Sequence, residues 1–279
     1  MFSFLSDFFQ KKAIDCFAPI PLERCRITKP YLLEREGIGE GTAILFAVPY
    51  FTPACDFPGR NLSAYAVGKN YHQFFERLFD ELLPLLRQRF PQYRFAGFAD
   101  HSPIAEVDAA VRAGLGIRGR NGLLLTEKYS SYVFLGSLIT DAKLPCQPRE
   151  LVDCENCGAC LKKCPATDCG GCLSALTQKK GELSPTETAA ILRYGSVWGC
   201  DICQEVCPHT AKAKKNGSIY SPIPFFAEDS LPHLTLAALD AMTDTEFEER
   251  AYAWRGRNTV RRNLILLENH QKEKEDTVC

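Results

Sequence analysis

Hydrophobic residues recur with two different periods along the first half of the chain. Short, nearly continuous apolar runs are typical of buried strands. The strand candidates are 43–50, 122–126 and 132–138. Between them, residues 71–90 place apolar side chains every three or four positions, which predicts an amphipathic helix that Pro84 kinks or divides. With a second helix expected at 104–113, the pattern predicts an α/β domain over residues 1–150.

The second half has less regular patterning. Residues 222–232 carry three prolines and two adjacent phenylalanines, which indicates a linker or an irregular packed stretch. A final helix is expected over 244–270, followed by a polar, frayed end at 271–279. We therefore expect a linker and a C-terminal basic helix in the segment 216–279.

Composition narrows the class of protein. The chain is 46% hydrophobic and 24% charged, which excludes disordered and fibrous proteins. Its formal charge of -1 means that a polyanion would have to meet a local basic face. No apolar run approaches the roughly 18 residues that span a bilayer, and the opening MFSFLSDFFQKK does not have the order of a signal peptide. We expect a cytoplasmic protein without a membrane segment.

Fourteen cysteines then change the picture, because a reducing compartment disfavours disulfides. Nine of the fourteen lie between Cys154 and Cys207, so they indicate metal ligands in a separate module over 151–215. Within it, CENCGACLKKCP has the CxxCxxCxxxCP spacing of bacterial ferredoxins, and CDICQEVCP follows. In this spacing the first three thiolates bind one cubane and the cysteine before proline binds its neighbour.

The two motifs supply seven thiolates, whereas two [4Fe-4S] clusters need eight. Cys169 and Cys172 are the candidates for the eighth, and we favour Cys172. One predicted ligand set is Cys154, Cys157, Cys160 and Cys207, and the other is Cys164, Cys172, Cys200 and Cys203. Two structural zinc sites are the alternative, although a zinc ribbon does not crowd so many thiolates into one loop.

Two neighbouring clusters would form an electron wire that needs a terminus. The GxGxxG match at 114–119 follows a helix candidate and leads into a strand, whereas a dinucleotide site requires the reverse order, so these are better interpreted as turn glycines. No DxHxxG occurs, so no histidine in that pattern is available as the lower ligand of a corrinoid.

Several motifs in sequence order resemble one known family. They are LSAYAVGKNYHQFF, FADHSPIAEVDAAVRAGLGIRGRNGLLL, SSYVFLGSLITD, the cysteine run, GCLSALT and YGSVWGCDICQEVCP. Over about residues 40–210 the chain is similar to epoxyqueuosine reductases, which are cobalamin-dependent iron-sulfur enzymes of queuosine synthesis. The resemblance implies a nitroreductase-like cobalamin-binding domain followed by a ferredoxin-like module with two [4Fe-4S] clusters.

The resemblance also implies the reaction and its partners. The substrate would be epoxyqueuosine at the wobble position of tRNA, reduced to queuosine with loss of water. An external donor such as a flavodoxin or a ferredoxin would supply electrons, and we expect a monomer. Alternatives are a corrinoid iron-sulfur reductase for another small epoxide, halide or nucleoside, and a non-catalytic two-cluster electron carrier that would purify without corrinoid.

By the same resemblance, Asp100 of DHSP corresponds to the family's proposed proton donor. The alternative is that Asp100, or equally Ser102, caps the helix at 104–113. Cobalamin contacts are implied for Tyr71, His72, Asp100, Asn121, Ser131 and Asp201. Tyr71 and His72 are equally well explained as a packed aromatic and a surface histidine, and Asp201 as a cap or an exposed turn residue.

The chain departs from the family in three places. Asn70 and Arg120 stand where the family has aspartate and lysine, and HEAT-like repeats that help to hold tRNA would be absent from a short form. Phosphate contacts would then fall to basic residues near the end of the chain, although a solvated charged face explains them equally well. They are Arg255, Arg257, Arg261 and Arg262 with Lys212, Lys214 and Lys215.

Overall fold

The computed structural model describes residues 1–166 and 170–278 and divides the chain into two compact units. Unit 1 consists of Met1–Tyr50, His72–Gly158 and Pro208–Ile223, and unit 2 of Phe51–Tyr71, Ala159–Cys207 and Pro224–Cys279. Each unit is therefore assembled from three separate stretches of sequence. The division of the chain into segments ending at 150 and 215 stays a prediction.

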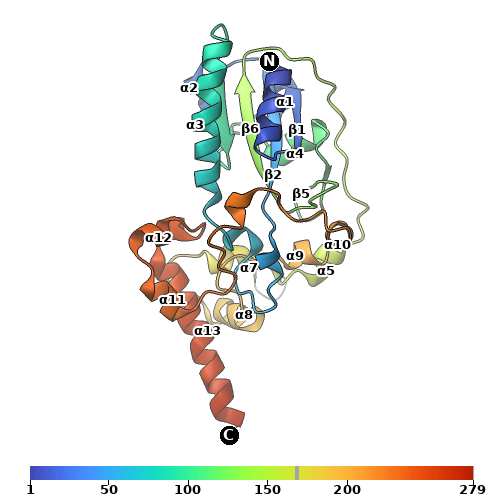
Figure 1. Ribbon diagram of the computed structural model, residues 1–279. Coiled ribbons are helices and arrows are strands. Elements are labelled where there is room, and N and C mark those ends of the chain that lie inside the picture. Colours follow the sequence, from blue (N-terminus) through green and yellow to red (C-terminus); the bar gives the residue numbers. More distant parts are fainter. Residues whose placement is uncertain (167–169, 279) are drawn as a thin grey trace. The chain divides into compact units, whose positions relative to one another are not determined.

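Unit 1 is built on a four-stranded antiparallel sheet with the order β1-β2-β6-β3 (Figure 1). The strands are β1 (Cys16–Pro21), β2 (Thr42–Pro49), β6 (Val133–Thr140) and β3 (Phe95–Ala99). The runs at 43–50 and 132–138 thus coincide with the two central strands. All eight residues of β2 are buried, which explains why its sequence is apolar at almost every position.

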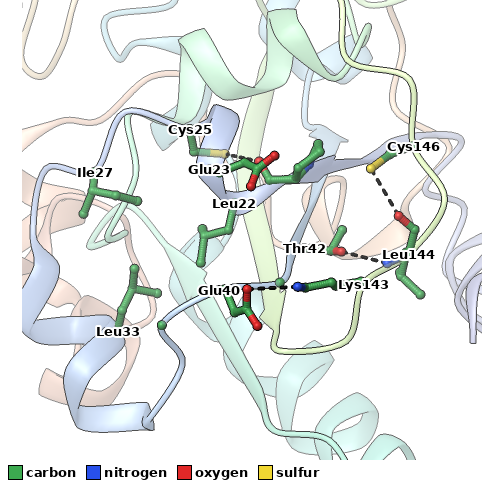
Figure 2. A pocket seen from close by; sticks show the side chains of 13 residues that line it. Leu22, Glu23, Cys25, Ile27, Leu33, Glu40, Thr42, Lys143, Leu144 and Cys146 are labelled. Atoms are coloured by element: carbon green, nitrogen blue, oxygen red, sulfur yellow. Dashed lines mark hydrogen bonds and ion pairs between the residues drawn. The ribbon is translucent and has the colours of Figure 1, made fainter.

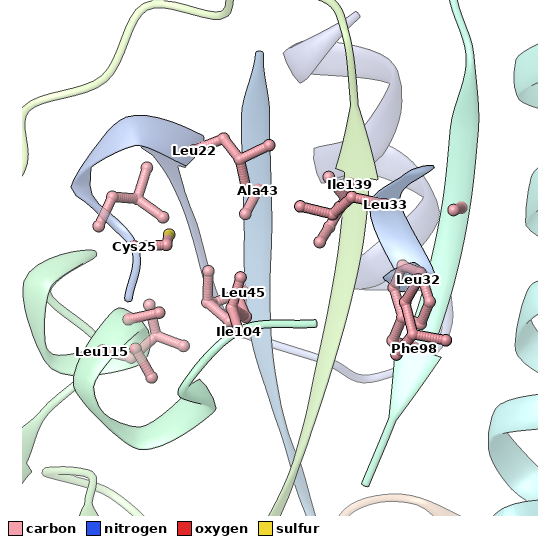
Figure 3. Packing of buried hydrophobic residues seen from close by; sticks show 14 of the residues in the cluster. Leu22, Cys25, Leu32, Leu33, Ala43, Leu45, Phe98, Ile104, Leu115 and Ile139 are labelled. Atoms are coloured by element: carbon pink, nitrogen blue, oxygen red, sulfur yellow. The ribbon is translucent and has the colours of Figure 1, made fainter. Parts of the chain in front are cut away.

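Helices cover both faces of this sheet. They are α1 (Phe2–Lys11), α2 (Pro30–Glu36), α3 (Tyr71–Arg89) and α4 (Glu106–Arg112). On one face, Phe46 of β2 meets Phe9 of α1 and Phe75 of α3, with ring centroids 4.9 and 6.0 Å apart. On the other, Ala43 and Leu45 belong to a core with buried residues of α2 and α4 (Figure 3). Alternate side chains of one strand therefore serve two cores, and the mixed α/β class is confirmed.

Helix α3 approaches the sheet closely over two glycines. A Cβ at Gly136 would lie 2.4 Å from the ring of Phe46 and 2.6 Å from that of Phe75, and one at Gly97 would lie 2.3 Å from Phe79. The helix continues through Pro84, so the predicted boundary there is wrong. Proline removes one backbone hydrogen bond, but the apolar face of α3 packs on both sides of it, which is sufficient to maintain the helix.

The remaining elements of unit 1 are short. They are η1 (Leu22–Arg24), β4 (Ile117–Arg118), β5 (Leu124–Leu125) and α10 (Pro208–Lys215). Strands β4 and β5 pair antiparallel, so the predicted strand at 122–126 is reduced to Leu124–Leu125. The glycines between 114 and 119 do follow a helix and precede a strand, as the sequence order indicated.

Unit 2 consists of short helices and one long helix, α13, around an aromatic core. Its described elements are η2 (Pro53–Asp56), η3 (Ala64–Ala66), α5 (Ala159–Lys163), α7 (Leu173–Thr177), α8 (Pro185–Tyr194), α9 (Ile202–Glu205), η4 (Pro224–Phe226), α11 (Leu236–Ala241), α12 (Asp244–Glu248), η5 (Ala253–Arg255) and α13 (Arg257–Val278). The fully buried Trp198 and Tyr252 lie at the centre of this core. Buried Asn263 donates to the carbonyls of Thr177 and Val197 at 2.8 and 2.9 Å, which joins α13 to the cysteine-bearing segment.

The expectation of one helix over 244–270 is wrong. A turn over η5 and Gly256, which has φ +85°, separates α12 from α13. The capping box of Thr243 and Glu246 starts the first helix, and Gly256 releases the backbone into the second. Helix α13 then continues to Val278, which lies within the segment 271–279 that was predicted to be frayed. Within the described residues, the helices are too short or too polar to cross a bilayer.

Candidate active site and thiol-rich module

Asp100 lies directly after β3, in a left-handed backbone conformation with φ +59°. The amide of His101 donates to the carbonyl of Ala99 at 2.6 Å, so the chain reverses tightly around Asp100. A positive φ is uncommon for residues other than glycine, although aspartate and asparagine tolerate it best. Such conformations are concentrated at functional sites, and here the turn presents the carboxylate at the end of an edge strand.

His72, in the first turn of α3, lies within ion-pair distance of Asp100. Its Nε2 lies 3.4 Å from Oδ2 of Asp100, and the two side chains are 46% and 55% exposed. Two predicted site residues, separated by 28 positions, are thus brought together at one end of the sheet. The histidine pairs electrostatically with the carboxylate only when it is protonated.

Glu106 is a third titratable group at this site, and sequence reasoning missed it. It is the first residue of α4, and its Oε1 is shielded from solvent without a hydrogen-bond partner. Burial, together with the nearby Asp100 carboxylate, raises the pKa of Glu106 to about 8, although Lys29 and a hydrogen bond with Ser102 oppose the rise. Glu106 is therefore largely protonated at neutral pH.

His101 has one defined tautomer. Its Nδ1 lies 3.2 Å from Nζ of Lys29, and its Nε2 lies 2.9 Å from the hydroxyl of Tyr31. Because a protonated lysine only donates, Nδ1 must accept, and a neutral His101 then carries its proton on Nε2 and donates it to Tyr31. This contact holds the ammonium group of Lys29 on the side of the site where its charge lowers the pKa of Glu106.

The capping alternative for Asp100 and Ser102 is wrong. Helix α4 begins at Glu106 and its N-cap is Ala105, which makes no side-chain cap. Ser102 is buried, and its hydroxyl lies 3.3 Å from that of Ser137 and 3.4 Å from the amide of Ile104. The carboxylate of Asp100 is consequently not used to begin the helix.

The other residues predicted to contact cobalamin lie in different settings. Asn121 is in the β4–β5 turn, where its Oδ1 accepts from the amide of Leu123 at 3.3 Å while its buried Nδ2 has no partner. Ser131 is buried just before β6. Tyr71 belongs to unit 2, where its ring packs edge-on against Tyr65.

The carboxylate of Asp201 forms its hydrogen bonds within unit 2. One of its oxygens accepts from Arg60 and from the amide of Ala64, both at 2.6 Å, and the other accepts from Ser63 at 2.5 Å and Gln204 at 3.0 Å. The alternative of an exposed turn residue is therefore wrong, whereas Asp201 does occupy the N-cap position of α9, without a side-chain cap hydrogen bond. Asp201 instead fixes the loop that carries Cys200 and Cys203.

Three predicted ligands are close to one another in unit 2. Burial, together with the proximity of Asp201, Cys203 and Cys172, raises the pKa of Cys200 to about 12, so these thiols lie within electrostatic range of one another. Cys172 directly precedes α7, and Cys203 lies in α9, which packs against α5 near Cys160 and Cys164. The grouping supports Cys172 as a ligand, while Cys169 lies outside the described residues.

Cys154 and Cys157 lie in unit 1, on a loop shaped by two positive φ angles, at Asn156 and Gly158. The amide of Cys154 donates to the carbonyl of Arg118 at 2.9 Å. Glu155 accepts from His209 at 2.8 Å, which links this loop to α10. The loop is thus anchored at Cys154 and Glu155 without using either thiol.

Within 1–166 and 170–278, no three His, Cys, Asp or Glu side chains converge as a single-ion site would require. A cubane holds its thiolates further apart, because each binds a different iron atom. Outside the module, burial raises the pKa of Cys16 and of Cys25 to about 12, which marks them as unreactive core thiols. For cobalamin, the unpaired Nδ2 of Asn121 provides a buried donor of the kind that its amide side chains accept.

A separate cavity of about 510 Å³ lies at the end of the unit 1 sheet that is opposite to the Asp100 site. Figure 2 shows the side chains that line this cavity. Its lining includes Leu22 and Leu33, and an ion pair between Glu40 and Lys143, 2.9 Å long, crosses its rim. It borders the start of β2, whereas Asp100 follows the end of the antiparallel strand β3, next to the start of β6. This cavity is therefore not part of the Asp100 site.

Three of the arginines predicted to contact phosphate have internal partners. Arg257 donates to the carbonyls of Leu239 and Thr243, Arg261 pairs with Asp240, and Arg262 donates to the carbonyls of Lys179 and Gly181. These guanidinium groups hold α13 against the other elements of unit 2. Among the four, Arg255 differs, because its guanidinium stacks on Trp254.

Together the two units define a class of mixed α/β proteins that join a layered sheet to a thiol-rich helical unit in one chain. Solved structures with this fold include epoxyqueuosine reductase from Streptococcus thermophilus, with a TM-score of 0.72 and 24% identity over 96% of this chain and 80% of that one. Another, crystallised with an epoxyqueuosine-modified tRNA-Tyr stem loop, has a TM-score of 0.74 and 23% identity over 95% of this chain and 81% of that one.

Curated sequences narrow the class further, although no protein-family model matches the chain. Epoxyqueuosine reductase of Gloeobacter violaceus is 31% identical over 234 residues, which are 80% of this chain and 72% of the relative. That of Listeria monocytogenes is 32% identical over 74% of this chain and 56% of the relative, and that of Pseudomonas aeruginosa is 33% identical over 67% and 53%. The chain belongs to the epoxyqueuosine reductase family, whose members are oxidoreductases. It spans little more than half the length of the latter two relatives.

Proposed function

We propose that this chain reduces epoxyqueuosine to queuosine in tRNA, with two [4Fe-4S] clusters and cobalamin as its cofactors. The observation that carries the proposal is the identity of 31% with a curated epoxyqueuosine reductase across 80% of the chain. The reaction consumes two electrons and two protons, breaks both carbon–oxygen bonds of the epoxide and releases one water. The electrons would come from an external low-potential donor, such as a flavodoxin or a ferredoxin.

The proposed cofactors would have different roles in the reaction and different residues to hold them. Cobalamin, when bound, supplies the reducing centre for the epoxide, and the clusters supply its electrons. Asn121 and Ser131 would hold the corrin periphery of a nitroreductase-like unit 1, and the two predicted sets of four cysteines would hold the clusters of a ferredoxin-like module. The thiol grouping of Cys172, Cys200 and Cys203 supports the second set.

Asp100 would protonate the departing oxygen. Its half-exposed carboxyl group stands on a tight turn with His72 at 3.4 Å, so it is both accessible and oriented. Glu106 would keep a proton close by, because its pKa of about 8 leaves it neutral at pH 7. The pKa of Glu106 is influenced by three neighbouring groups, which are Lys29, Asp100 and Ser102. Of these, Asp100 is the one that becomes negatively charged when it gives up its proton.

The test is analysis of tRNA nucleosides from a bacterial strain that lacks its own epoxyqueuosine reductase. Supplying this chain should convert accumulated epoxyqueuosine to queuosine. With purified protein, Asp100→Asn should lower kcat by roughly 10²- to 10⁴-fold, the usual contribution of a general acid. Asp7→Asn, an exposed aspartate of α1, removes the same charge and should leave kcat unchanged. Conversion by Asp100→Asn at the parent rate would exclude the assigned role.

A further inference from the structure

Trp254 is the most exposed of the large hydrophobic side chains in the described residues, at 59%. The chain has one other tryptophan, Trp198, which is completely buried. Large aromatic side chains are usually mostly buried, so an indole that faces solvent calls for an explanation.

The turn that carries Trp254 is firmly anchored. Tyr252, two residues earlier, is fully buried in the core of unit 2. Within η5 the amide of Ala253 donates to the carbonyl of Arg250 at 3.0 Å, and that of Gly256 donates to the carbonyl of Ala253 at 2.8 Å. The indole is therefore presented to solvent from a fixed backbone rather than from a long loop.

Arg255 adds a positive charge to this ring. Its guanidinium carbon lies 3.9 Å from the centroid of the Trp254 ring, and its Nε is buried without a hydrogen-bond partner. In the described part of the chain no carboxylate pairs with Arg255, whereas Arg257 and Arg261 are paired with Asp244 and Asp240. The cation remains available to an anion that approaches the indole.

We propose that Trp254 and Arg255 form a stacking platform for an unpaired base of the RNA substrate. The proposal rests on the proposed function, because it specifies how this chain would hold its tRNA. Every base has a π face that stacks on an aromatic ring, and the adjacent guanidinium matches the phosphate that follows the base. A protein partner would need a wider apolar patch, but the flanking Gly256 and Asn258 are exposed and not hydrophobic.

Tryptophan fluorescence tests the platform directly. The probe is a synthetic anticodon stem-loop RNA, added to the full chain. Stacking on Trp254 should quench its emission, while buried Trp198 provides the remaining constant signal. Trp254→Leu should abolish the quenching and weaken binding of the stem-loop about tenfold or more, whereas Trp254→Phe should retain most of the affinity. Unaltered affinity in Trp254→Leu, or an RNA complex without quenching in the parent, would overturn the proposal.

Two controls separate this inference from its alternatives. Phe57→Leu changes another exposed aromatic of unit 2, 49% exposed, and should leave RNA binding unchanged. A blunt RNA duplex of the same length, which offers no unpaired base, should bind without quenching; equal quenching by it would contradict base stacking. Because the readout is binding, weaker binding of the stem-loop by Trp254→Leu supports the platform even if the parent chain fails to reduce epoxyqueuosine, so failure of one proposal can be told from failure of the other.

Discussion

A glutamate that keeps its proton at neutral pH makes stability depend on pH in a defined direction. Between pH 4.5 and about 8, the folded state holds the Glu106 proton that the unfolded chain has released. The free energy of unfolding should therefore fall as pH rises, by at most about 1.4 kcal/mol per unit from this group. Above about pH 8 this contribution is exhausted.

Glu106→Gln should remove that slope. We expect the variant to gain stability relative to the parent as pH increases from 5 to 8, measured as the difference in urea midpoints at each pH. Glu76→Gln, on an exposed position of α3, removes a carboxyl group without removing the slope and is the control. Parallel pH profiles for Glu106→Gln and the parent would contradict the assigned burial.

At the scale of single residues, motifs identified Asp100 and His72 but not Glu106. An acidic residue in the first turn of a helix ordinarily stabilises the helix dipole at the surface, so its sequence position gives no sign of burial. Glu106 is buried only in the folded chain, where Ser102 hydrogen-bonds to it and Lys29, distant in sequence, lies near it. The burial of Asp201 was equally invisible in the sequence, because its partners Arg60 and Ser63 are distant along the chain.

At the scale of elements, the packing of α3 on the sheet depends on the absence of two side chains. Gly136→Ala should destabilise the protein by about 1–3 kcal/mol, because the added methyl group would overlap the rings of Phe46 and Phe75. Gly39→Ala is the matched control, since nothing lies within 4 Å of its Cβ position. Urea denaturation of both variants checks this; equal midpoints would show that α3 shifts without penalty.

Sequence patterns predicted the elements that are long or buried on both sides. The periodic α3 and the continuous strands β2 and β6 were found, because their burial extends over many residues. Both edge strands were missed, since β1 carries Pro19 and Pro21 and β3 is short with a glycine. An edge strand tolerates proline because one side of it needs no hydrogen-bond partner, but in a sequence a proline usually indicates that a strand is interrupted.

At the scale of the whole molecule, the cofactor assignment predicts iron content. Anaerobically prepared protein should contain about eight iron atoms per chain, and Cys172→Ala should contain about half of that because one cluster loses a ligand. Cys146→Ala, outside the predicted ligand sets, should keep the full amount. Full iron in Cys172→Ala would transfer the eighth position to another cysteine, and zinc in place of iron would remove the clusters altogether.

The path of the chain through the two units has a consequence for modular exchange. Unit 1 needs Pro208–Ile223, which follow the cysteine motifs, and unit 2 needs Phe51–Tyr71, which precede them. No single cut therefore separates the two units from each other, because any fragment that contains one unit complete also carries part of the other. One gene fusion or one recombination event cannot transfer the thiol-rich unit alone to another oxidoreductase.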